Sequence, residues 1–343
     1  MKYSFYNDYS EGAHPAILEA LAQNNTDQQA GYGKDDYCAE ASDLIRERIG
    51  QPNADVHFVA SGSLANIIGL NALFSKPYES VISAKSGHIH VHEAGALEAT
   101  GHKINEVETT DGKLTPEAVR SVVAAHQDEH QVQPKVVYIS QLTELGTAYT
   151  KAELEGLYTT AKELGLYFYI DGARLGSAVV SETSGATIED IAQLCDMFYI
   201  GSTKNGALLG EAMVILHNDV KKDFRYHIKQ RSGLLAKGRV MGVQFKALFT
   251  NDLYFDLARH ANAMAAKLAR GIQSAGYELL AQVDGNQVFP ILPMDVVKRM
   301  ETEYGFYVWF KVDDTHSAVR LVTSWATKEE MVDMFINDVR AFN

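Results

Sequence analysis

Two residues with complementary chemistry, Asp171 and Lys204, each follow a strand-like run of the sequence. The runs are Leu166–Ile170 and Met197–Ile200. A carboxylate at one strand end can keep a pyridine nitrogen protonated, and a lysine at a nearby strand end can form an imine with an aldehyde. Proteins use this pairing to harness pyridoxal 5'-phosphate (PLP) as an electron sink. The pair therefore predicts a PLP site, with Asp171 at the pyridine nitrogen and Lys204 as the imine lysine.

The turn Ser61-Gly62-Ser63 is the candidate phosphate site. It follows the predicted strand His57–Ala60 and opens a predicted helix. Free backbone N–H groups and the helix dipole favour an anion there, and the two hydroxyls add donors. Taken alone, such a turn is more often only a serine-capped helix start. The Walker lysine and the dinucleotide-binding G-x-G-x-x-G are both absent, which disfavours other phosphate folds.

Three histidines, His88, His90 and His92, could suggest a metal centre. However, the order H-x-x-x-H-E is not the zinc-protease pattern H-E-x-x-H, and no third ligand spacing is obvious. We therefore expect no metal site. A histidine ring stacked on a flat aromatic cofactor agrees better with the other residues, and His88 is the best placed for it.

Arg320 lies between apolar neighbours in the strand-like run Val319–Ser324. An arginine in such a setting needs a carboxylate partner. The pattern leaves two alternatives open, a structural ion pair within the protein or the carboxylate of a ligand.

Composition limits the classes of protein to consider. The 343 residues carry a formal net charge of −13, which argues against a nucleic-acid binder because such a protein shows a basic surface. No stretch reaches the roughly 18 apolar residues that span a membrane. The N-terminal residues lack the apolar core of a signal peptide, and the two cysteines form no disulfide framework. These features predict a soluble protein of the cytoplasm.

Strand-like and helix-like segments alternate through most of the chain. The candidate strands are His57–Ala60, Ser80–Ala84, Lys103–Val107, Lys135–Ser140, Leu166–Ile170, Met197–Ile200 and Ala212–Leu216. The candidate helices between them include Ser63–Phe74, Thr115–Glu129, Lys151–Leu164 and Thr187–Leu194. This alternation predicts an α/β protein with a seven-stranded, mostly parallel sheet covered by helices on both faces. Ligands of such sheets bind beyond the carboxyl ends of the strands, where Asp171 and Lys204 lie.

The pattern changes after about residue 250. Leu257, Ala261, Met264, Leu268 and Ile272 share one helical face. Short strands are then expected at Gln287–Leu292, Tyr307–Val312 and Ala318–Ser324, followed by a closing helix from Lys328 to about Phe342. We therefore predict a large cofactor domain over residues 1–250, with an N-terminal arm to about residue 30, and a small α+β domain over residues 251–343.

Six motifs in order resemble the threonine aldolase branch of the β-eliminating lyases, which are PLP enzymes of the aspartate aminotransferase fold (fold type I). The similarity spans almost the whole chain. The matching segments are Gly31–Asp36 (Y-G-D-D/E in the family), Ser61–Asn66 (T-G-T-Q-A-N), His88–Gly95 (H-x-x-x-x-E-A-G), Asp171–Arg174 (D-G-A-R), Thr203–Gly206 (S-K-G) and Val319–Thr323 (V-R-L-V-T).

The resemblance implies a role for each candidate residue. The catalytic residues would be Lys204, His88 and Glu144. The cofactor-binding residues would be Lys204, Asp171, Ser61, Gly62, Ser63, His88, Arg174, Thr203 and Lys237. The substrate-binding residues would be Arg320, Arg174, Ser10 and Tyr32.

Three departures from the family pattern concern the substrate and phosphate contacts. The family's N-terminal R-S-D-T is replaced near Phe5–Ser10, and its T-G-G-G-M-R is Ser232–Lys237 here, so that Lys237 or Arg239 would replace the phosphate-facing arginine. The family's T-H-N-G is Thr143–Gly146 here. Glu144 therefore occupies the position of a histidine that in the family lies near the substrate β-hydroxyl.

The expected reaction is retro-aldol cleavage of a β-hydroxy-L-amino acid, threonine or allo-threonine, to glycine and an aldehyde. Other reactions on the same cofactor, such as β-elimination, racemisation and transamination, stay open because the sequence does not reveal which Cα bond breaks. A non-catalytic binding protein of this fold and a lysine aldolase without PLP are lesser alternatives, since neither needs both Asp171 and Lys204. The resemblance also implies a homodimer or homotetramer with active sites between subunits, and a small amino acid as the only other partner.

Overall fold

A seven-stranded sheet forms the centre of the computed structural model, which describes residues 1–342. The strand order is β2-β8-β7-β6-β5-β3-β4; β8 runs antiparallel to both neighbours and every other pair is parallel. The strands are β2 (Asp55–Val59), β3 (Glu79–Ala84), β4 (Ile104–Val107), β5 (Gln133–Ser140), β6 (Tyr167–Asp171), β7 (Met197–Gly201) and β8 (Glu211–Ile215). The predicted mostly parallel sheet is thus confirmed.

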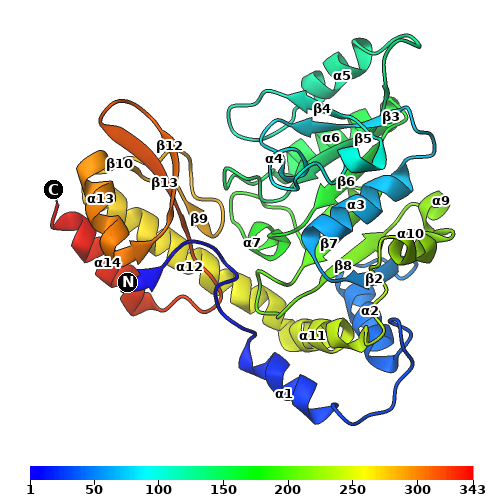
Figure 1. The fold of residues 1–343 in the computed structure, drawn as a ribbon, viewed down its shortest axis with the longest axis horizontal. Helices are drawn as coiled ribbons and strands as arrows, with labels where there is room; N and C mark the ends of the chain where they lie inside the picture. Colours follow the sequence, from blue (N-terminus) through cyan, green and yellow to red (C-terminus); the bar gives the residue numbers. More distant parts are fainter. Residues whose placement is uncertain (343) are drawn as a thin grey trace.

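Helices cover both faces of this sheet (Figure 1). One core lies between the sheet and α2 (Asp36–Arg48), α5 (Pro116–Ala124), α6 (Lys151–Glu163), α8 (Ile188–Gln193) and α11 (Arg239–Phe249). The other core lies under α3 (Gly62–Leu73) and α10 (Phe224–Gln230).

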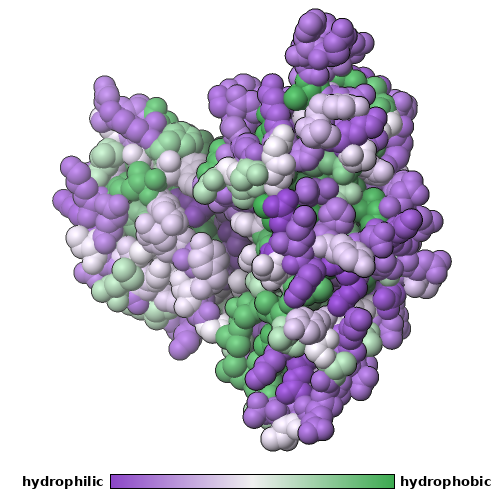
Figure 2. Space-filling view, turned by 45° about the vertical axis from the view of Figure 1, so that its right-hand side comes forward, coloured by the Kyte–Doolittle hydropathy of each residue, from purple (hydrophilic) through white to green (hydrophobic). Residues whose placement is uncertain are grey.

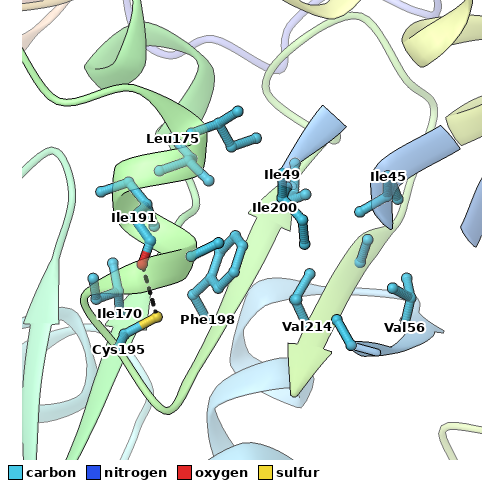
Figure 3. Packing of buried hydrophobic residues seen from close by; sticks show 14 of the residues in the cluster. Ile45, Ile49, Val56, Ile170, Leu175, Ile191, Cys195, Phe198, Ile200 and Val214 are labelled. Carbon is cyan, nitrogen blue, oxygen red and sulfur yellow. Dashed lines mark hydrogen bonds between the residues drawn. The ribbon is translucent and has the colours of Figure 1, made fainter. Parts of the chain in front are cut away.

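Side-chain alternation along the strands divides these two cores. Phe198 and Ile200 of β7 point into the first core, where Figure 3 shows them near Ile45, Ile191 and Val214. Tyr199, between them, points into the second core.

Threonine caps fix the starts of helices α5 and α6. Thr115 caps α5 ahead of Pro116, and Thr150 forms a reciprocal capping box with Glu153 at the start of α6. Both starts agree with the sequence prediction, although α5 ends at Ala124, earlier than predicted.

The C-terminal part is a smaller α+β unit built on the long helix α12 (Leu253–Ser274) (Figure 1). Its other elements are β9 (Gln287–Val288), β10 (Ile291–Pro293), α13 (Met294–Glu303), β11 (Tyr304–Gly305), β12 (Tyr307–Lys311), β13 (His316–Val322) and α14 (Glu329–Arg340). The single strand expected at Gln287–Leu292 is two short strands, β9 and β10, which both pair with β13.

The N-terminal residues pack on this C-terminal unit. Strand β1 (Tyr3–Ser4) pairs in parallel with β11, and Phe5 is fully buried in the C-terminal core. Both chain ends therefore lie in the same lobe, as Figure 1 shows. The division of domains at about residue 250 stays a prediction.

Shorter helices complete the fold: α1 (Pro15–Gln23), α4 (His88–Val91), η1 (Glu98–Thr100), α7 (Leu175–Val179), α9 (Asn218–Lys221) and η2 (Thr250–Asp252). Within residues 1–342 no helix has the length and apolar character needed to cross a membrane.

Candidate active site

The carboxyl ends of β5, β6 and β7 meet at one edge of the sheet. Ser140 at the end of β5 is in register with Asp171 at the end of β6. Lys204 lies in the turn that follows β7. The predicted strand-end placement of Asp171 and Lys204 is what the structure has.

The Asp171 carboxylate is buried but fully hydrogen-bonded. Oδ2 accepts from Tyr138 Oη (2.6 Å) and Asn66 Nδ2 (2.8 Å), whereas Oδ1 accepts from Tyr199 Oη (2.5 Å) and the Ala173 backbone N–H (3.0 Å). Burial alone would raise the pKa of Asp171, but the charge of His88 and these hydrogen bonds outweigh it and hold the pKa below its usual value. The site therefore holds an ionised carboxylate at the end of β6.

A row of tyrosines explains how α3 comes close to this carboxylate. Tyr138, Tyr169 and Tyr199 share the face of the sheet that α3 covers, by strand alternation. Two glycines of α3 allow the approach: a Cβ on Gly62 would lie 3.0 Å from Tyr199 Oη, and one on Gly69 would lie 2.7 Å from the Tyr169 ring.

The start of α3 is the predicted phosphate turn. Ser61 caps the helix, with its Oγ accepting from the Leu64 N–H (3.4 Å). Ser61 is exposed, and Gly62 and Ser63 are half-buried. Because the first N–H groups of a helix have no partner within it, this end can bind an anion close to Asp171.

Lys204 lies in a turn whose two ends are joined by hydrogen bonds. The Ser202 N–H donates to the Gly210 carbonyl (3.1 Å), and the Thr203 hydroxyl donates to Glu211 Oε1 (2.9 Å). Among residues 1–342 no carboxylate lies within 4.0 Å of the Lys204 ammonium. Burial, followed by the charge of Arg174, lowers the pKa of Lys204. A lysine with a lowered pKa and no ion-pair partner is suited to nucleophilic attack.

His88 begins α4 and is oriented by Glu93. His88 Nδ1 lies 2.8 Å from Glu93 Oε1, and Asn66 Nδ2 donates to the same oxygen (2.7 Å) as well as to Asp171. Burial would lower the pKa of His88, but Glu93 and Asp171 outweigh it and raise the pKa. Ligand atoms of His88, Glu93 and Asp171 lie within 4.8 Å of one another, a spacing that could also hold a metal ion. Hydrogen bonds also link the three groups, because His88 contacts Glu93 and Asn66 bridges Glu93 and Asp171. The absence of a metal stays a prediction.

Glu144 follows β5 and lies at the same edge of the sheet. Its Oε1 accepts from Ser140 Oγ (2.7 Å). Burial, with a smaller contribution from the charge of Asp171, raises the pKa of Glu144. Its carboxyl group therefore holds a proton more readily than an exposed glutamate does.

Arg174 is bound by an aspartate from the N-terminal segment. Its Nε and Nη2 donate to the two oxygens of Asp8 at 2.8 and 3.1 Å. Asn286 of the C-terminal unit donates to the same carboxylate (2.9 Å). This junction brings the N-terminal segment and the C-terminal unit against the start of α7.

Arg320, on β13, has no such partner. Its Nε is buried and unbonded, and no described carboxylate lies within 4.0 Å of its guanidinium. Of the two alternatives that the sequence left open, a structural ion pair is absent from residues 1–342.

Three predicted site residues lie on the surface of this single chain. Ser10 is exposed and donates to Asn7 Oδ1 (3.0 Å), and Tyr32 is 47% exposed. Lys237 is exposed, and its ammonium has no hydrogen bond or ion pair within the described residues. Tyr32 and Lys237 lie near each other, because the Tyr32 N–H donates to the Ala236 carbonyl (3.2 Å).

Sequence reasoning missed the residues that hold the site together. They are Asp8, Asn66, Glu93, Tyr138, Tyr199, Glu211 and Asn286. The sequence does carry one sign of them: Tyr138, Tyr169 and Tyr199 lie in three successive strands, at positions that face the same side of the sheet. Asp8 stands 166 positions from Arg174, and no local pattern links them.

Figure 2 shows a hollow in the surface between two lobes. We call the smaller α+β unit the C-terminal lobe, and the part that contains the seven-stranded sheet the sheet lobe. Residues of both lobes contribute to the region of the site, because Asp8 joins Arg174 of the sheet lobe to Asn286 of the C-terminal lobe.

The fold defines the class of protein. An aspartate aminotransferase structure from Thermus thermophilus, 16% identical, superposes with a TM-score of 0.74 over 100% of this chain and 92% of that chain. The chain therefore has the fold type I architecture of PLP enzymes.

Sequence comparison gives the family, because the β-eliminating lyase family model matches residues 7–294. This chain belongs to the β-eliminating lyase family. A low specificity L-threonine aldolase of Pseudomonas aeruginosa is 32% identical over 98% of this chain and 96% of its own length. A threonine aldolase structure from Leishmania major is 45% identical, with a TM-score of 0.97 and coverage of 99% of both chains. The resemblance to the threonine aldolase branch is confirmed.

Proposed function

We propose that this protein binds PLP and cleaves a β-hydroxy-L-amino acid, threonine or allo-threonine, to glycine and an aldehyde. The observation that carries the proposal is the pair formed by Asp171 and Lys204. A buried, ionised carboxylate and a half-buried lysine without an ion-pair partner lie at the ends of neighbouring strands. The choice of reaction is supported by the similar proteins that are named threonine aldolase.

The residues present fit the cofactor. Lys204 would hold its aldehyde, Asp171 its pyridine nitrogen, and the start of α3 with Ser61, Gly62 and Ser63 its phosphate. The Asp171 carboxylate already accepts four hydrogen bonds. Since two carboxylate oxygens offer about four lone-pair positions, a pyridine N–H would displace one present donor.

Thr203 and Arg174, which were also predicted to contact the cofactor, are bonded to other groups of the protein. The Thr203 hydroxyl is engaged by Glu211 and by the Gly210 N–H (3.1 Å), so we assign it to shaping the Lys204 turn. Arg174 is held by Asp8, which makes it a fixed positive charge beside the site.

Substrate binding is assigned to Arg320. Its buried, unbonded Nε needs an acceptor, and a carboxylate that accepts from Nε and one Nη would satisfy it. Fixing the carboxylate also fixes the rotation about Cα, and thereby which Cα bond is exposed to cleavage.

Glu144 and His88 are the candidates for removing the β-hydroxyl proton. Both lie near the Asp171 carboxylate, as its charge acts on the pKa of each. When bound, PLP supplies the electron sink that accepts the electrons of the broken Cα bond. The protein then has to hold the substrate, take up one proton and return one.

We further propose a homodimer or homotetramer. Tyr32 and Lys237 lie on the surface of one chain although the family pattern places their segments at the active site. A second copy that brings these segments to its neighbour's site would reconcile the two. The cytoplasm is the proposed location.

The central test is covalent capture of the cofactor. Purified protein should be yellow, and borohydride should fix PLP to it; Lys204→Ala should lose this fixation. Lys103→Ala, at an exposed lysine, is the matched control and should keep it. A colourless protein that takes up no PLP would end the proposal.

The reaction is tested with a panel of amino acids. Threonine and allo-threonine should yield glycine and an aldehyde. Ammonia and a keto acid from β-substituted amino acids would instead identify a β-eliminating lyase on the same cofactor.

A further inference from the structure

Arg320 differs from Arg174 in how its charge is stabilised. Arg174 has the bidentate carboxylate of Asp8, whereas no described carboxylate reaches Arg320. An arginine that is partly buried without an acidic partner loses hydration, so something else in the structure must offset that loss.

Two aromatic rings lie where a carboxylate partner of Arg320 would be expected. The Arg320 guanidinium carbon lies 4.7 Å from the centre of the Tyr307 ring and 4.9 Å from that of the Trp309 ring. Both distances are within the range of cation–π attraction.

The pairing of β12 with β13 explains how both rings reach one guanidinium. Tyr307 is directly opposite Arg320, and Val308 is opposite Val319. The register then shifts, so that Phe310 is opposite Ala318 and Trp309 has no register partner. Such a bulge re-aims a side chain, here beside the candidate site.

The two rings are themselves supported from other segments. Tyr6 of the N-terminal segment lies against Tyr307, with ring centres 3.8 Å apart. Phe289 meets Trp309 edge-on at 5.7 Å. The rings are therefore held by the N-terminal segment and by the chain between β9 and β10.

We propose that Tyr307 and Trp309 form an aromatic clamp that fixes the Arg320 guanidinium by its faces and so makes the site select ligands with a free α-carboxylate. A ring binds the face of the guanidinium and leaves the N–H edge free, whereas a protein carboxylate would occupy that edge and compete with the ligand. The buried Nε lies on this edge. The clamp rests on the proposed function, which supplies the amino-acid ligand.

The experiment compares ligands with and without a carboxylate. Holoenzyme is titrated with glycine and with glycinamide while the absorbance of bound PLP is followed. Wild type should bind glycine more tightly. Trp309→Leu and Tyr307→Leu should each weaken glycine binding by roughly 2- to 30-fold, the range expected for one cation–π contact. Neither should weaken glycinamide binding.

Two controls separate the clamp from general structural support. Tyr307→Phe keeps the ring and should behave like wild type. Phe310→Leu changes an exposed neighbour that does not touch Arg320 and should also have no effect. In turnover, the two leucine variants should raise KM more than they lower kcat. Equal weakening of glycine and glycinamide, or unchanged glycine binding, would overturn the clamp.

A second readout keeps the clamp testable if the proposed reaction fails. In a Trp325→Phe background Trp309 is the remaining tryptophan, and its fluorescence should respond to glycine but not to glycinamide. A protein that cleaves no threonine but shows this selectivity would lose the aldolase proposal and keep the clamp. No response of Trp309 to glycine would overturn the clamp itself.

Discussion

Asp171 and Glu144 are carboxylates at the same edge of the sheet, yet their surroundings act on them in opposite directions. Burial would raise the pKa of both. For Asp171 the charge of His88 and the hydrogen bonds from Tyr138, Tyr199 and Asn66 outweigh burial and lower the pKa. For Glu144 burial prevails over the opposing hydrogen bond from Ser140 and raises the pKa. One group thus stays charged and the other can exchange a proton. Such divergence between neighbouring acids is typical of acid–base sites.

Glu144 leads to a prediction about pH. A general base works only when deprotonated, so activity should rise with pH through a pKa that lies above the usual glutamate value of 4.5. Glu144→Gln keeps an acceptor for Ser140 but should lose this rise, with a fall in kcat of roughly 10²- to 10⁴-fold. The measurement is the pH profile of kcat/KM. An unchanged profile in this variant, and its loss in His88→Asn, would assign the base to His88.

Glu211 leads to a prediction about stability. Burial raises the pKa of Glu211 to about 8 from the ordinary value of 4.5, against the opposing hydrogen bond from Thr203. The folded protein therefore binds an extra proton between these two values, so this group makes stability fall as pH rises through that window.

Glu211→Gln cannot titrate and should remove this decline. Its free energy of unfolding relative to wild type should increase from about pH 5 to about pH 9, by roughly 1.4 kcal/mol at most for each pKa unit of difference. Urea unfolding at a series of pH values measures this. Parallel pH profiles for the two proteins would contradict the prediction.

The sequence predicted this site in part. Asp171, Lys204 and the Ser61 turn follow strands, and strand ends of a parallel sheet converge, so local pattern was enough. The environment of each group was not predictable, because it depends on residues far away in the chain. Asn66 and Asp171 are 105 positions apart, and Asp8 and Arg174 are 166 apart. Only the folded structure brings such pairs together.

At the scale of elements, close contact between β6 and β7 depends on Gly172. A Cβ at this position would lie 1.8 Å from the Tyr199 carbonyl oxygen, a backbone atom that can move only if strand β7 shifts. The Gly172 carbonyl also accepts from the Gly201 N–H (3.0 Å). The glycine therefore keeps the ends of both strands, and hence Asp171 and Lys204, side by side.

Gly172→Ala should destabilise the protein by about 1–3 kcal/mol or more, since overpacking forces the backbone to shift. Gly12→Ala is the control: a Cβ there meets nothing within 4 Å, and its effect should stay within about 0.5 kcal/mol. Denaturant unfolding compares the two. A Gly172→Ala protein as stable as the control would contradict the close contact.

The alternation of elements predicted the seven strands, but two features escaped it. The register shift at Trp309 leaves no trace in the alternation of Tyr307–Lys311. Strand β1 is two residues long, too short for any periodic pattern, and it is a strand only because β11 lies beside it.

Asp8 links three parts of the molecule: the N-terminal segment, the sheet lobe and the C-terminal lobe. It is buried, and its carboxylate binds Arg174 and Asn286. Burial would raise the pKa of Asp8, but the charges of Arg174 and Lys204 and the hydrogen bonds outweigh it and hold the pKa below 3.8.

Asp8→Asn should cost about 3–5 kcal/mol, because it leaves the largely enclosed Arg174 charge without an anionic partner. A group with a lowered pKa stabilises above its unfolded pKa and stops doing so as pH falls through the folded one. The two proteins should therefore converge in stability at strongly acid pH. Lys2→Met, which breaks an exposed pair with Asp338, should remain close to wild type. Equal losses in both variants would contradict a special role for Asp8.

The pairing of β1 with β11 also bears on how a newly made chain completes its fold. Tyr3 and Ser4 pair with Tyr304 and Gly305, so one partner leaves the ribosome long before the other is translated. At roughly 5–20 residues per second, about 15–60 s separate the two. During that interval Phe5, buried in the finished protein, has no core to enter. The C-terminal lobe should consequently be the last part to close.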